Sequence, residues 1–128
     1  MSYYFARTLA SSHDAAIERV KTALADRGFG VLTSIDVAAT MKNKLGVEFR
    51  PYTILGACNP HFAWRALQEE DKIGALLPCN VIVTETKPGS VEIAAVDPVV
   101  SMASVANPRL AELAGTVRTT LVDAINSA

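Results

Sequence analysis

The stretch 52–67, YTILGACNPHFAWRAL, constrains the fold most because it runs from an apolar strand directly into a helix. Residues 52–57 are continuously apolar, which is typical of a strand covered on both faces. Asn59 is a preferred helix N-cap, and Pro60 at the first helical position loses no hydrogen bond that the helix needs. The pattern therefore places Cys58 where the strand passes into the helix.

Strands and helices alternate along the rest of the chain. Apolar runs predict strands over residues 3–9, 30–35, 47–57, 81–85 and 91–96, with a bulge or edge position at Pro51. Helices are predicted from Ser11 or Ser12 to Gly28, from Asp36 to Gly46, from Asn59 to about Asp71, and after Asn107. Residues 87–90 form the turn of a hairpin, whereas residues 99–106 are an apolar connection of no definite form.

This order, β-α-β-α-β-α-β-β-α, predicts a single α+β domain over residues 1–128. We expect its helices to pack on one face of a mixed or mostly antiparallel sheet. The chain is long enough for one core and too short for two.

Composition narrows the class of partner. With 12 basic and 13 acidic side chains the net charge is -1, so no basic field is available for nucleic acid. No apolar run reaches the roughly 20 residues that span a bilayer, so no membrane contact is expected. The N-terminal residues do not have the pattern of a signal peptide, so a cytoplasmic location is expected. The 50% hydrophobic content and mean hydropathy of +0.24 indicate a buried subunit interface.

The second sequence motif, LLPCN at residues 76–80, places Cys79 at the start of another apolar strand. Because a helix start offers free N–H groups and the positive end of the helix dipole, we expect a small ligand or an anion to bind there. The candidate ligand-binding residues at these strand ends are Cys58, Asn59, Pro60, Cys79, Asn80 and Asp97.

Each of these residues also has a structural interpretation. Cysteine is commonly a small core residue, Asn59 is explained by capping, and Asn80 and Asp97 by turn formation. Trp64 is interpreted as packing or as an interface anchor.

Thiol chemistry is an alternative function. A helix start lowers the pKa of a nearby thiol, so Cys58 is a candidate nucleophile with Cys79 as its resolving partner. His61 could serve as a base, although a surface position is more common. A soft metal would need Met102 or His61, or ligands from the second subunit of a dimer, in addition to Cys58 and Cys79. No CxxC spacing is present. A structural or assembly domain without a ligand is the third interpretation.

The runs PYTILGACNP and LLPCNVIV, followed by a later Asp-Pro pair before a methionine, resemble a bacterial and archaeal family called domain of unknown function 302. The resemblance extends from GFGVLTSIDV to the terminal helix. It implies a compact α+β domain and a homodimer, and it assigns no activity, substrate or cofactor. The family pattern falls on Gly56, Cys58, Asn59, Pro60, Ala63, Leu77, Pro78, Cys79, Asn80, Asp97 and Pro98.

Overall fold

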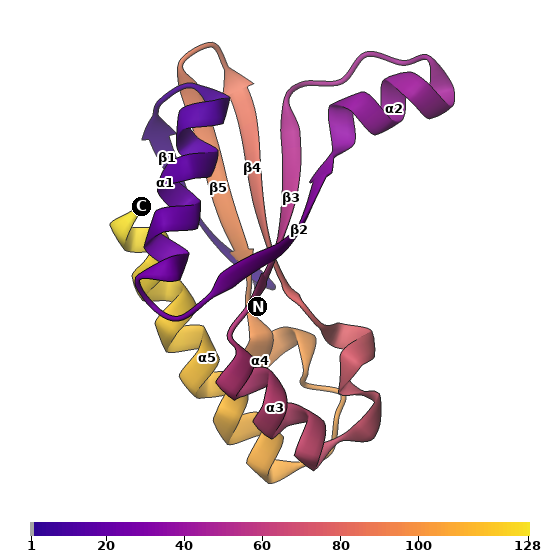
Figure 1. The fold of residues 1–128 in the computed structure, drawn as a ribbon, viewed down its shortest axis with the longest axis vertical. Helices are drawn as coiled ribbons and strands as arrows, with labels where there is room; N and C mark the ends of the chain where they lie inside the picture. Colours follow the sequence, from indigo (N-terminus) through magenta and orange to yellow (C-terminus); the bar gives the residue numbers. More distant parts are fainter. Residues whose placement is uncertain (1) are drawn as a thin grey trace.

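A five-stranded antiparallel sheet with strand order β1-β5-β4-β3-β2 is the frame of the molecule (Figure 1). The structure is a computed structural model that describes residues 2–128. Its elements are β1 (Tyr4–Ala10), α1 (His13–Ala25), β2 (Gly30–Asp36), α2 (Val37–Leu45), β3 (Tyr52–Cys58), α3 (Pro60–Glu69), the 3-10 helix η1 (Asp71–Leu76), β4 (Cys79–Lys87), β5 (Ser90–Val96), α4 (Pro98–Ser101) and α5 (Pro108–Ser127). The predicted α+β class and the predicted element order are confirmed, and the sheet is antiparallel at every strand pair.

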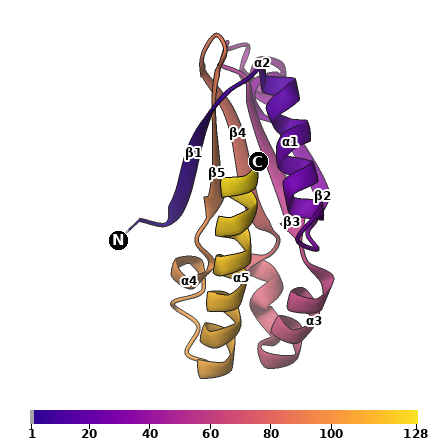
Figure 2. The same cartoon turned by 90° about the vertical axis from the view of Figure 1, so that its left-hand side faces the viewer.

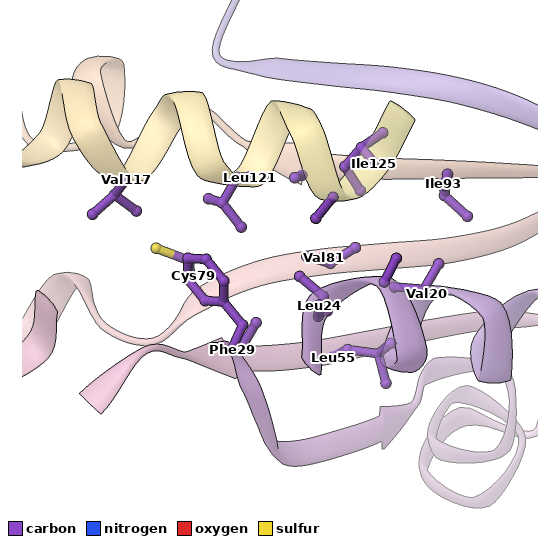
Figure 3. Close-up of a cluster of buried hydrophobic side chains, with 14 of the residues drawn as sticks. Val20, Leu24, Phe29, Leu55, Cys79, Val81, Ile93, Val117, Leu121 and Ile125 are labelled. Carbon is purple, nitrogen blue, oxygen red and sulfur yellow. The ribbon is translucent and has the colours of Figure 1, made fainter. Parts of the chain in front are cut away.

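Helices α1 and α5 cover one face of the sheet, as Figures 1 and 2 show. The core lies between them and the inward side chains of the strands, because alternate residues of a strand face the same layer. Leu24 from α1, Leu55, Val81 and Ile93 from three strands, and Leu121 from α5 are fully buried there (Figure 3).

The opposite face of the sheet carries no helix layer. Leu55 on β3 is fully buried, whereas Tyr52 and Ile54, which face the other way, are half-buried. The continuous apolar run of β3 is therefore covered by helices on one face only. This uncovered layer is the open face of the sheet.

Two of the boundaries that differ from the sequence-based expectation are those of β3 and α3. Residues 46–51 are not a strand, and β3 begins at Tyr52, directly after Pro51, which has no N–H for a sheet hydrogen bond. Helix α3 ends at Glu69, and Glu70 then caps η1 by accepting a hydrogen bond from the Lys72 N–H at 3.2 Å. Among the described residues, no helix combines the length and apolarity that crossing a bilayer requires.

Candidate functional site

Pairing of β3 with β4 brings the two cysteine motifs together. Ala57 lies opposite Cys79 in the ladder, so Cys58, the next residue, is a diagonal neighbour of Cys79. Both cysteines are free thiols; Cys58 is half-buried and Cys79 is buried. Residues that are distant in the sequence therefore meet at one end of the sheet, beside the start of α3.

A small cavity, here called the cysteine cavity, lies at this junction between the sheet, α3 and α5. Its volume is about 30 Å³, enough for about two water-sized groups. Apart from Asn59 its lining residues are apolar or carry sulfur. They are Phe29, Ala57, Cys58, Asn59, Phe62, Ala63, Ala66, Leu77, Pro78, Cys79, Met102, Leu113, Ala114 and Val117.

The start of α3 is already capped by its own side chain. Asn59 Oδ1 accepts hydrogen bonds from the His61 N–H at 3.1 Å and the Phe62 N–H at 3.4 Å. These are amides that an anion would need, and they are already occupied. Pro60 and His61 are exposed and do not line the cavity.

Burial makes Cys79 a poor nucleophile. Its side chain lies between β4 and α5, with the sulfur directed toward Val117 (Figure 3). Two causes together raise the pKa of Cys79 to about 11: mainly desolvation by burial, and to a smaller extent the nearby charge of an ionised Cys58. The two thiols are thus close enough to interact electrostatically, and Cys79 stays protonated at neutral pH.

Asn80 lies away from the cysteine cavity. It is exposed, next to Cys79, on the open face of the sheet. There it lines a second depression, the sheet groove, of about 430 Å³. The groove is bounded by Tyr3, Tyr4, Tyr52, Asn80, Ile82, Glu92, Ala94, Ala95 and Val96.

Asp97 has a structural role at the start of α4. Its Oδ1 accepts a hydrogen bond from the Val99 N–H at 3.0 Å, and its Oδ2 accepts one from Arg118 Nε at 2.9 Å. The carboxylate is buried and joins α4 to α5. Of the residues predicted from sequence, the structure places Cys58, Asn59, Cys79 and Met102 around one cavity, whereas Pro60, Asn80 and Asp97 lie outside it.

Sequence reasoning did not place Phe29 and Phe62 at the site. Their rings are 6.3 Å apart and both contribute to the cavity wall. Phe29 follows the end of α1, and no local pattern connects it with the start of α3. Within residues 2–128 there is no group of three or more His, Cys, Asp or Glu side chains that could hold a metal ion.

These features define an antiparallel α+β domain whose two cysteine motifs meet at an apolar cavity. The chain belongs to the family described as domain of unknown function DUF302, whose model matches residues 5–128. It is similar to the crystal structure of an uncharacterized conserved DUF302 protein from Bacillus stearothermophilus, with 28% sequence identity and a TM-score of 0.92. That similarity covers 99% of this chain and 98% of the other. None of the curated proteins compared with the chain matches it.

Proposed function

We propose that the protein is a homodimeric binding module whose ligand is a small apolar molecule held in the cysteine cavity. The observation that carries this proposal is the convergence of both cysteine motifs on one cavity at the start of α3. Apolar cavities with few polar groups favour apolar guests over water. An anion is the weaker choice, because Asn59 already accepts hydrogen bonds from the amides it would use.

The size of the cavity limits the ligand. A volume of about 30 Å³ admits roughly two or three heavy atoms after slight relaxation of the walls. The best small ligands gain about 1.5 kcal/mol per heavy atom, so a ligand of three atoms binds no tighter than about 0.5 mM. The thioether of Met102 and the thiols of Cys58 and Cys79 provide soft, polarizable contacts for the ligand.

Dimethyl sulfide is a suitable probe, because it is apolar, soft and contains three heavy atoms. Its titration is followed through the methyl resonances of Met102 and Val117, which line the cavity. The proposal expects saturable shifts of these resonances with dimethyl sulfide and none with phosphate. Saturable shifts with phosphate at His61 and Phe62 would instead favour an anion site.

A cavity-filling substitution provides the matched control. Ala114 is 2% exposed and lines the cavity, whereas Ala111 lies on the same helix and is exposed. Ala114→Val is expected to abolish the shifts while Ala111→Val leaves them unchanged. If Ala114→Val is poorly folded, Ala63→Val on α3 fills the same cavity from a half-buried position and repeats the test. Binding that persists in both filled variants would contradict the proposal.

The homodimer in this proposal is supported by the apolar surface of the chain. Among residues 2–128, eleven large hydrophobic side chains are exposed, including Tyr3 at 67%, Leu32 at 68% and Leu45 at 69%. Large apolar side chains exposed in this number favour a surface that a partner covers. Sedimentation velocity tests it: a dimer of 13.6 kDa chains is expected, and a monomer at every concentration would contradict it. The cytoplasm is the proposed location, because two free thiols persist in a reducing compartment.

A thiol-dependent activity at Cys58 is the second candidate function. Cys58 is the more exposed of the two cysteines, and the raised pKa of Cys79 leaves Cys58 as the better nucleophile. Ala57 pairs with Cys79, and Cys58, the next residue, projects to the opposite face of β3 because side chains alternate along a strand. A disulfide between Cys58 and Cys79 therefore requires the end of β3 to change conformation. If the wild-type protein shows neither ligand binding in the cysteine cavity nor reactivity at Cys58, the third interpretation remains, an assembly domain without a ligand.

A further inference from the structure

We propose that two copies of the chain dimerise by exchanging an arm, residues 37–51, which packs on the open face of the partner's sheet. The arm consists of α2 and the segment that connects it to β3. This inference rests on the homodimer of the proposed function, and it assigns the surfaces that form the interface. It does not depend on the ligand of the cysteine cavity.

Within its own chain the arm is only partly covered: Val37, Ala38 and Met41 are half-buried and the other residues of α2 are exposed. Figure 1 shows α2 projecting away from the sheet, on the side opposite to α1 and α5. No residue of α2 is buried. A helix of nine residues is marginal in water without tertiary packing, so its stability calls for a covering surface.

The apolar side chains of the arm supply the contact surface. Val37, Met41 and Leu45 recur at four-residue spacing and form one stripe of α2. Leu45 is 69% exposed, and Val47 and Phe49 beyond it are 46% and 42% exposed.

The base of the arm is fixed beside the sheet groove. The Arg50 guanidinium lies 4.5 Å from the centroid of the Phe49 ring and 5.5 Å from that of Tyr52. Arg50 Nε also donates a hydrogen bond to Thr84 Oγ1 at 3.0 Å. Tyr52 lines the groove as well, so the surface of the arm continues into it.

The sheet groove fits an apolar helix face. Its volume is about 430 Å³, and aromatic and aliphatic side chains dominate its walls. Tyr4 is 44% exposed at its edge, and Ile82 is half-buried in the groove. The groove carries one acidic side chain, Glu92, which complements Lys44 of the arm, whereas Lys42 is paired with Glu48 within the arm at 3.6 Å.

The chain exposes more surface than a compact monomer of its mass, which leaves area for a second copy to cover. The chain exposes 7323 Å², whereas a folded monomer of 13.6 kDa is expected to expose about 6,600 Å². The excess of roughly 700 to 800 Å² is close to the approximately 800 Å² that each partner buries in a standard interface. A twofold axis lets each arm cover the partner's groove reciprocally, so the same surfaces serve both subunits.

Two charged substitutions test the interface by sedimentation velocity. Leu45→Asp alters the arm and Ile82→Asp alters the groove, while Leu67→Asp makes the same change on α3, where Leu67 is 43% exposed. We expect each of the first two to weaken dimerisation by about tenfold or more, with Leu67→Asp unchanged. Because Ile82 is half-buried, circular dichroism checks that this variant is folded, and Leu45→Asp stands independently since its side chain is at the surface.

A cross-linking experiment locates the arm. Benzoylphenylalanine replaces Leu45 in a mixture of ¹⁴N- and ¹⁵N-labelled full-length chains, and the cross-linked peptides are read by mass spectrometry. Mixed-isotope pairs joining position 45 to residues 80–84 or 92–96 support the proposal. Cross-links within one chain, or cross-links to the helices, overturn the arm exchange. So does a dimer that neither Leu45→Asp nor Ile82→Asp weakens. These outcomes leave the homodimer itself intact. A monomeric wild-type protein overturns both.

Discussion

Cys58 lies one residue beyond Ala57, the residue that pairs with Cys79 across the β3–β4 ladder. The register therefore gives two neighbouring thiols different surroundings: Cys58 is half-buried, and Cys79 is closed in between the sheet and α5. This asymmetry governs how the two residues react and how the fold responds to pH.

The first prediction concerns alkylation. Because burial raises the pKa of Cys79 to about 11, only about one Cys79 in a thousand is a thiolate at pH 8. Iodoacetamide is expected to label Cys58 first and Cys79 only above about pH 10 or in denaturant, with peptide mass spectrometry as the readout. Equal labelling of both cysteines at pH 8 in the folded protein would show that Cys79 is accessible.

The second prediction concerns stability in alkali. The pKa of Cys79 is raised on folding from 9.0 to about 11, so the unfolded chain loses this proton first as pH rises. The contribution is fully present below pH 9 and is lost between about pH 9 and pH 11, at a cost of about 2 to 3 kcal/mol. Urea unfolding of wild type and Cys79→Ala across this range measures it, because other titrating groups are common to both. Parallel pH curves for the two proteins would refute the prediction.

The third prediction compares two glycines. A Cβ on Gly56 would collide with Thr33 Oγ1 and lie 2.8 Å from Pro78 Cγ, whereas nothing lies within 4 Å of one on Gly115. Gly56→Ala is expected to destabilise the protein by about 1 to 3 kcal/mol. Gly115→Ala, inside α5, is expected to stabilise it by up to about 1 kcal/mol. Urea midpoints compare them, and equal shifts of the same sign would contradict the packing at Gly56.

The fourth prediction separates the two roles of Asp97. Asp97→Asn keeps an oxygen that caps α4 but loses the ion pair with Arg118, whose side chain is 46% exposed. We expect a loss of up to about 1 kcal/mol for Asn and about 1 kcal/mol more for Asp97→Ala, which also removes the cap. Thermal unfolding of the two variants measures the difference. Identical losses would assign the whole effect to the ion pair.

Local signals predicted the elements because capping acts within a few residues. Asp36 accepts a hydrogen bond from the Ala39 N–H at 2.9 Å, and Asn107 accepts one from the Arg109 N–H at 3.0 Å, at the starts of two predicted helices. The prediction of a strand over residues 47–50 was wrong, because alternating apolar and polar residues do not by themselves supply a strand to pair with. Pro51 also lacks the N–H that would extend the ladder of β3.

The candidate site depends on contacts that a single sequence does not contain. Both cysteine motifs could be placed at strand ends, but their meeting depends on the order β4-β3, which no local pattern specifies. Asn80 follows Cys79 directly and yet faces the opposite layer, because side chains alternate along a strand. Asp97 was recognised beside its proline, whereas its pairing with Arg118 of α5 is a tertiary contact.

A crystal structure after a dimethyl sulfide soak tests the central claim, binding in the cysteine cavity, most directly. The account predicts difference density enclosed by Ala63, Met102 and Val117, with no such density in crystals of Ala114→Val. Density confined to the sheet groove, or an empty cavity at saturating ligand, would contradict it.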